Sequence, residues 1–102
     1  MKKILLCCSA GMSTSMLVQK MVKAAEARGM ECQIEAHPVA TFEEKIQQYD
    51  VCLLGPQVRF QLEDLRKTAS LHGKQVDAIS PMAYGMMKGE EVLDQALSLM
   101  NK

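Results

Sequence analysis

The chain has 102 residues, which is the common size of a single domain, so we expect one domain over residues 1–102. Its 12 basic and 12 acidic residues balance, which excludes proteins that hold nucleic acid or anionic membranes through bulk charge. No apolar run has the length of a membrane span or of a signal-peptide core. We therefore expect a cytosolic protein whose cysteines are thiols, and the absence of a C-x-x-C pair argues against a metal site.

The chain opens with alternating strand and helix patterns. Residues 3–8 form a continuous apolar run, typical of a strand that is covered on both faces. Residues 15–28 repeat apolar side chains at helical spacing, and Gly29 is a natural stop for that helix. Residues 31–37 alternate polar and apolar side chains, which predicts an edge strand that Pro38 ends.

A short helix is predicted next. Thr41 and Glu44 form the pattern of a capping box, and the apolar side chains of residues 42–49 share one face. Residues 51–54 are a second fully apolar strand pattern, which a Gly-Pro pair ends.

The last third of the chain repeats the alternation. Residues 62–72 carry a helical apolar stripe, and residues 76–79 form a short strand pattern. A loop is predicted over residues 80–89, and a final helix over residues 93–100.

Strands that alternate with helices through short connections predict parallel strands joined by right-handed crossovers. The expected fold is α/β, a three-layer αβα sandwich around a four-stranded parallel sheet. Pattern alone leaves the strand order open. With the order 2-1-3-4, the topological switch lies beside the first strand, and a ligand would bind at the carboxyl end of that strand.

The segment that follows the first strand has the composition of an anion site. It consists of Cys8, Ser9, Ala10, Gly11, Met12, Ser13, Thr14 and Ser15. Small side chains let successive backbone N–H groups converge on one anion, and the following helix adds free N–H groups and the positive end of its dipole. The same groups would stabilise a thiolate, which makes Cys8 the candidate nucleophile and residues 9–15 the candidate phosphate-binding loop.

Residues 4–19 contain no charged side chain. Tyrosine phosphatases have a related loop, in which an arginine follows the cysteine after five residues, and Thr14 stands in that place here. An arginine that clamps a phosphoryl transition state contributes about a thousand-fold in rate. Its replacement indicates a loop that passes phosphate to a partner rather than to water.

The octapeptide C-S-A-G-M-S-T-S strongly resembles the phosphocysteine loop of the cellobiose/diacetylchitobiose-type IIB components of the bacterial sugar phosphotransferase system. The pentapeptide L-L-G-P-Q, residues 53–57, and the pair Tyr84-Gly85 match the family in register, so the resemblance covers nearly the whole chain. It implies the sheet order 2-1-3-4 and a fold similar to that of low-molecular-weight tyrosine phosphatases.

The resemblance also implies a role in a relay. A IIA protein carrying phosphohistidine would donate to Cys8, and the phosphoryl group would pass to a β-glucoside or disaccharide bound by the membrane protein IIC. Backbone amides of residues 9–15 would bind the phosphate, and neither a cofactor nor a nucleic-acid partner is expected. Pro56, Gln57 and Tyr84 are candidates for partner contact, with a packed Tyr84 as the alternative.

The remaining reactive residues are predicted to be structural. Cys7, Cys32 and Cys52 lie in apolar runs or on an inward strand face, and His37 and His72 are expected to be solvated histidines. An apolar rim near the loop is a hypothesis for five methionines: Met12, Met16, Met82, Met86 and Met87.

Two alternative functions remain. The first is a cysteine phosphatase or arsenate reductase on the same fold, which the missing arginine disfavours. The second is a small anion-binding regulatory module in which Cys8 is incidental.

Overall fold

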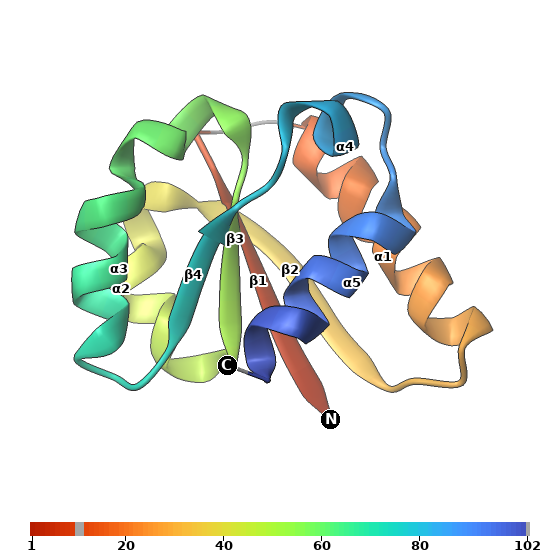
Figure 1. Ribbon diagram of the computed structural model, residues 1–102, viewed down its shortest axis with the longest axis horizontal. Helices are drawn as coiled ribbons and strands as arrows, with labels where there is room; N and C mark the ends of the chain where they lie inside the picture. Colours follow the sequence, from red (N-terminus) through yellow and green to blue (C-terminus); the bar gives the residue numbers. More distant parts are fainter. Residues whose placement is uncertain (10–11, 102) are drawn as a thin grey trace.

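A computed structural model of the chain describes residues 1–9 and 12–101, without the side chains of residues 12 and 13. Its centre is a sheet of four parallel strands in the order β2-β1-β3-β4 (Figure 1). The strands are β1 (Lys2–Cys8), β2 (Cys32–Pro38), β3 (Val51–Leu54) and β4 (Gln75–Ala78). The predicted α/β fold and the order 2-1-3-4 are confirmed.

Helices cover both faces of the sheet and complete three layers (Figure 1). One face carries α1 (Met12–Ala27) and α5 (Gly89–Met100), and the other carries α2 (Phe42–Lys45) and α3 (Leu62–Ser70). The connections contain a five-residue helix and three 3-10 segments: α4 (Pro81–Gly85), η1 (Val39–Thr41), η2 (Ile46–Gln48) and η3 (Pro56–Gln61).

Two hydrophobic cores lie on either side of β1, because successive side chains of a strand point to opposite faces. Ile4 and Leu6 pack beneath α1 and α5. Leu5 and Cys7 pack beneath α2 and α3. All four are fully buried, and each buried aliphatic side chain contributes about 1.5–3 kcal/mol of hydrophobic free energy. The continuous apolar run at residues 3–8 is thus explained by burial on both faces.

Helices α1 and α5 begin earlier than predicted, at Met12 and Gly89, and three other local features differ from the sequence predictions. Helix α4 lies within the predicted loop, and the Ser80 side chain caps it by accepting from the Ala83 N–H at 3.0 Å. Thr41 does not form the predicted capping box, because its hydroxyl donates to the Pro38 carbonyl at 2.8 Å. Pro38 is the last residue of β2 instead of lying beyond it, a place where a strand tolerates a missing N–H.

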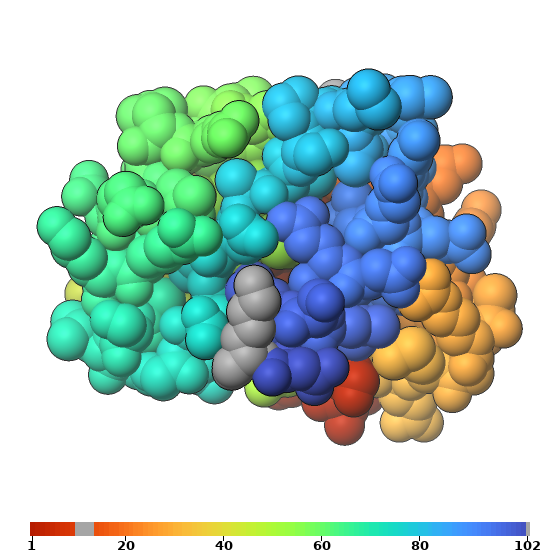
Figure 2. All heavy atoms as spheres, viewed as in Figure 1, coloured from red at the N-terminus to blue at the C-terminus, as the bar shows by residue number. Residues whose placement is uncertain are grey.

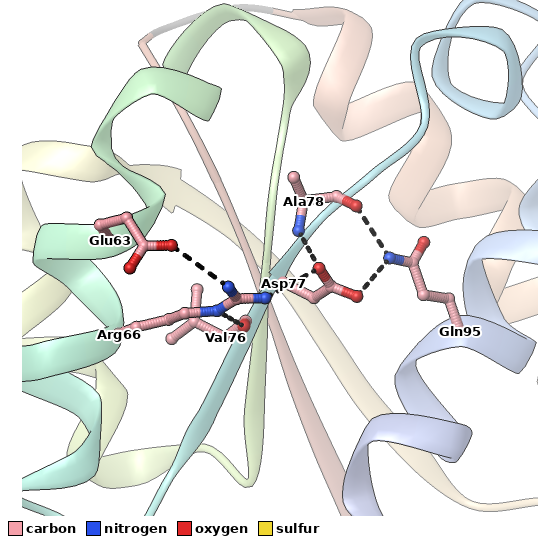
Figure 3. A network of polar contacts seen from close by, with 6 residues as sticks. All are labelled: Glu63, Arg66, Val76, Asp77, Ala78 and Gln95. Carbon is pink, nitrogen blue, oxygen red and sulfur yellow. Dashed lines mark hydrogen bonds and ion pairs between the residues drawn. The ribbon is translucent and has the colours of Figure 1, made fainter.

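The outer edge of β4 is closed by side chains from both helical layers (Figure 3). Arg66 of α3 donates from Nε to the Val76 carbonyl at 3.1 Å. Gln95 of α5 donates from Nε2 to the Ala78 carbonyl at 2.8 Å and to Asp77 Oδ2 at 3.1 Å. The other oxygen of Asp77 accepts from the Ala78 N–H at 2.9 Å. These bonds occupy backbone groups that would otherwise be open to pairing with another strand.

Candidate functional site

The candidate nucleophile lies at the carboxyl end of the central strand. Cys8 is the last residue of β1 and is only 5 % exposed. The strands on either side of β1 are β2 and β3, and the connections that follow β1 and β3 cover opposite faces of the sheet. This is the topological switch point, where open α/β sheets bind their ligands.

The loop after Cys8 leads directly into α1, whose first residue is Met12. The helix thus begins three residues before the predicted residue 15. Its first turn contains no acidic side chain, so nothing there opposes the attraction of its free N–H groups and dipole for an anion. Ala10 and Gly11 of the predicted phosphate loop lie outside the described residues.

The described side chains of the loop differ in exposure. Ser9 and Ser15 are exposed, whereas Thr14 is only 1 % exposed. Apart from the tyrosines and cysteines, Thr14 is the one buried residue with a polar side chain among those described. Because a buried hydroxyl without a hydrogen-bond partner is costly, we expect the Thr14 hydroxyl to be paired.

Thr14 is hydrogen-bonded to Tyr84 of α4, with 2.8 Å between the two hydroxyl oxygens. Gln57 of η3 donates from Nε2 to the same Tyr84 oxygen at 3.1 Å. In the space-filling view the side chains of η3 and α4 lie next to each other along the upper edge, where Figure 1 places the carboxyl ends of the strands (Figure 2). Tyr84 is 8 % exposed, so it is packed behind the loop, as the alternative prediction stated. Gln57 is exposed, and Pro56 is half-buried.

Position 55, just before Pro56 and Gln57, has room only for a glycine. Its N–H donates to the Cys7 carbonyl at 2.9 Å, which ties the turn after β3 to the end of β1. A Cβ at position 55 would lie 2.5 Å from Gln57 Oε1 and 3.5 Å from the Tyr84 ring. The Gln57 side chain folds back over space that only glycine leaves open.

The other cysteines occupy structural positions. Cys7 and Cys52 are fully buried on the α2 and α3 side of the sheet. Burial raises the pKa of the Cys52 thiol well above its usual range, and the neighbouring Cys7 thiol adds to that shift. A thiol that cannot ionise is a poor nucleophile. Cys32 is half-buried against the α1 side, and all four cysteines are free thiols.

A second polar cluster lies on the α2 side of β2, and sequence reasoning missed it. The Glu35 carboxylate accepts from Tyr49 Oη at 2.7 Å, from Gln33 Nε2 at 2.8 Å and from His37 Nε2 at 3.1 Å. These bonds, that of Tyr49 foremost, lower the pKa of Glu35 to about 2. Burial and the carboxylate raise the pKa of Tyr49 to about 12. The alternation of residues 31–37 carried a signal, because it put Gln33, Glu35 and His37 on one face.

The two histidines differ from each other. His37 is half-buried within this cluster instead of being a solvated side chain, so that prediction was wrong. His72 is exposed in the turn after α3, as predicted.

Exposed apolar side chains occur on the elements near the loop. Met16, Met82 and Met86 of the predicted methionine rim are exposed, whereas Met87 packs against the core. The Met12 side chain lies outside the described residues. Phe60 of η3 is 82 % exposed, a feature that the sequence did not single out.

Comparison with known proteins identifies the family. A family model described as "PTS system, Lactose/Cellobiose specific IIB subunit" matches residues 3–95. The chain belongs to this family. These IIB subunits are phosphoryl carriers of sugar uptake, phosphotransferases that act through phosphocysteine, and the function predicted from the octapeptide is confirmed at this level.

Related IIB components carry different sugar names. The chain is 47 % identical over 100 residues to the oligo-beta-mannoside-specific EIIB component of Bacillus subtilis, covering 98 % of this chain and 97 % of that protein. It is 44 % identical over 105 residues to a galactose-specific and to a cellobiose-specific EIIB component of Lactococcus lactis, with 98 % of this chain and 97 % of each relative covered.

Solved IIB structures have the same fold. The solution structure of a cellobiose-specific IIB component from Borrelia burgdorferi superimposes with a TM-score of 0.81 at 40 % identity, covering 98 % of this chain and 92 % of that one. The lactose-specific IIB domain from Streptococcus pneumoniae gives 0.87 at 20 % identity, with 96 % of each chain covered. Among the described residues of this IIB subunit, no helix is long and apolar enough to cross a bilayer.

Proposed function

We propose that Cys8 is the cysteine through which this IIB subunit carries phosphate. It would accept the phosphoryl group from a phosphohistidine of a IIA protein and pass it to a sugar held by a membrane IIC protein. The observation that carries the proposal is the position of Cys8, at the carboxyl end of the central strand and just before the N-terminus of the 16-residue helix α1. The buried, raised-pKa thiol of Cys52 is unsuited to this role.

The two transfers are in-line displacements at phosphorus. In the first, the Cys8 thiolate forms an S–P bond while the P–N bond to the donor histidine breaks, and the histidine nitrogen keeps the electron pair. In the second, a sugar hydroxyl oxygen forms an O–P bond while the S–P bond breaks. The thiolate leaves with its electron pair, and the hydroxyl proton passes to a base on the acceptor side. Neither transfer changes an oxidation state, and neither consumes a further reactant.

The phosphate would be held mainly by backbone amides of residues 9–15. Each hydrogen bond to a charged acceptor contributes about 1.5–3 kcal/mol, so several amides and the α1 dipole can hold a dianion without a basic side chain. A neutral threonine at the place of the phosphatase arginine withholds the charge that would speed attack by water. This property suits a carrier and disfavours the phosphatase alternative.

The sugar is proposed to be a β-glucoside or another disaccharide that IIC selects. Relatives at 44–47 % identity are named for oligo-beta-mannoside, galactose and cellobiose. Such different names among similar IIB proteins support a choice of sugar made outside the IIB subunit. We further propose that residues 1–102 act as one domain at the cytosolic face of the membrane, and that Pro56, Met16, Met82, Met86 and Phe60 supply contacts for IIA and IIC.

The test is a reconstituted relay. The protein is incubated with phosphoenolpyruvate, the general phosphotransferase proteins and a IIA protein, and added phosphate is mapped by intact and peptide mass spectrometry. We expect one phosphate on the Cys8 peptide, none in Cys8→Ser, and an unchanged yield in the control Cys32→Ser. Phosphate elsewhere, or none, would overturn the proposal. Rapid hydrolysis of an aryl phosphate would favour the phosphatase alternative.

A further inference from the structure

The hydrogen bonds among Gln57, Tyr84 and Thr14 have a direction that the donor chemistry fixes. An amide nitrogen donates and cannot accept, so the Tyr84 oxygen accepts from Gln57 Nε2 at 3.1 Å. The Tyr84 proton is buried and needs an acceptor of its own. Thr14 Oγ1, at 2.8 Å, is the acceptor that the described contacts provide. Thr14 therefore accepts from Tyr84, and its own proton points to an acceptor other than Tyr84.

We infer that Gln57 and Tyr84 are positioning residues of the phosphate loop: they orient the Thr14 hydroxyl so that it donates to the phosphoryl group on Cys8. The inference rests on the proposed function, in which Cys8 carries the phosphate. Thr14 is in the first turn of α1, at the N-terminal end of the helix, which is the end nearer to Cys8 in the chain. Its 1 % exposure removes water as a competing partner.

The two motifs outside the loop, L-L-G-P-Q at residues 53–57 and the pair Tyr84-Gly85, then share one physical role. Gly55 leaves room for the Gln57 amide, Gln57 sets the direction at Tyr84, and Tyr84 sets the direction at Thr14. Neither Gln57 nor Tyr84 touches the reacting atoms in this arrangement. Both act on the reaction through Thr14, with a neutral donor where a phosphatase has a charged one.

Reversal of the bond direction is the sharpest test. In Gln57→Glu the introduced carboxylate can only accept, so it takes the Tyr84 proton, and Tyr84 must then accept from Thr14. The shape is nearly unchanged, but the Thr14 proton turns away from the phosphoryl group. We expect the rate constant for transfer from IIA to Cys8 to fall about tenfold, the loss of one hydrogen bond to a charged group. The matched control is Gln61→Glu, which adds the same charge to the same 3-10 segment.

A second substitution separates direction from charge and from packing. Adding Tyr84→Phe to Gln57→Glu removes the oxygen through which the reversal acts. The double variant should therefore recover part of the rate, whereas a purely structural role for Tyr84 predicts a further loss. Each variant is first checked for an unchanged circular dichroism spectrum and for cooperative unfolding.

A spectroscopic measurement tests the inference without any phosphoryl transfer. The hydroxyl proton of Tyr84 should give a nuclear Overhauser contact to the Thr14 methyl group in the wild-type protein, and that contact should vanish in Gln57→Glu. The inference is overturned if the contact is absent in the wild type, if the two Glu variants transfer at the same rate, or if the double variant is slower still. Phosphorylation of Cys8 in all these proteins would uphold the proposed function even then, whereas a wild type without phospho-Cys8 would overturn both.

Discussion

Gly55 and Cys7 are joined by a backbone hydrogen bond of 2.9 Å from the Gly55 N–H to the Cys7 carbonyl, one residue before the candidate nucleophile. The turn after β3 is therefore fixed to the end of β1. The backbone from which the Gln57 side chain extends is therefore anchored close to Cys8.

Replacing Gly55 by alanine should impair transfer more than it impairs stability. The new methyl would lie 2.5 Å from Gln57 Oε1, and the flexible glutamine can swing away, so we expect a loss of about 1 kcal/mol in the free energy of unfolding, from one broken hydrogen bond. The rate of transfer to Cys8 should fall severalfold because Tyr84 loses its donor. Urea denaturation and transfer kinetics measure the two effects. Gly85→Ala, which meets nothing within 4 Å, is the control and should leave stability unchanged or slightly raised.

Replacing Gly89 by alanine should impair stability more than it impairs transfer to Cys8. A Cβ there would lie 2.6 Å from the Lys20 carbonyl carbon and 2.8 Å from its oxygen, so α1 and α5 would have to separate. Overpacking against backbone costs about 1–3 kcal/mol, and we expect a loss in the upper part of that range by urea denaturation. An unfolding free energy within 0.5 kcal/mol of the wild type, roughly the ordinary effect of a surface change, would contradict the close contact.

The cluster around Glu35 predicts an acid-dependent stability. Its pKa is lowered to about 2 in the folded protein, below its ordinary unfolded value of about 4.3. The stabilisation is thus fully present above pH 5 or so and is lost as the pH falls toward about 2. The wild type should exceed Glu35→Gln in unfolding free energy at neutral pH, and the difference should shrink on acidification. Partial exposure of the carboxylate keeps the difference small.

Tyr49 provides the companion experiment at high pH. Its pKa is raised to about 12, so the neutral phenol contributes stability below its unfolded value of about 10, and that contribution is lost as the pH rises through about 12. Spectrophotometric titration of the folded protein should show a tyrosine that ionises late. Tyr49→Phe should remove that late step, and its persistence in the variant would assign the step to another residue.

Opening the edge of β4 should promote self-association. The double variant Arg66→Ala with Gln95→Ala exposes the Val76 and Ala78 carbonyls that these side chains occupy, and free strand edges recruit other strands. Sedimentation velocity at increasing concentration should show a shift toward larger species. Lys67→Ala, an exposed change on the same helix, should sediment as the wild type does. Unchanged sedimentation of the double variant would show that the edge is protected in some other way.

The sequence predicted the parts of the fold that depend on local pattern. The burial of β1 follows from an unbroken apolar run. The helical spacing of residues 15–28 predicted α1 but not its first turn, because residues 12–14 carry no apolar stripe. Helix α4 was missed because five residues are too few for a periodic signal, although the Ser80-Pro81 pair is a recognisable helix start.

The parts of the candidate site that the sequence could not predict depend on contacts between residues far apart in the chain. Cys8 and its loop were predicted from one contiguous segment. The bond between Thr14 and Tyr84 joins residues 70 positions apart, and that between Tyr49 and Glu35 depends on how α2 and η2 pack against the sheet. Sequence placed Gln57 and Tyr84 near the loop only as candidates for partner contact, because side-chain direction is decided by packing that no local pattern records.

The burial of β1 between two cores has a consequence for how phosphate can move. A strand whose alternate side chains anchor opposite layers cannot shift without disturbing both, so the sulfur of Cys8 is a stationary point. On the proposed function, the travel between donor and acceptor would then be made by the whole protein, which would diffuse from one partner to the next and present the same surface around Cys8 to each.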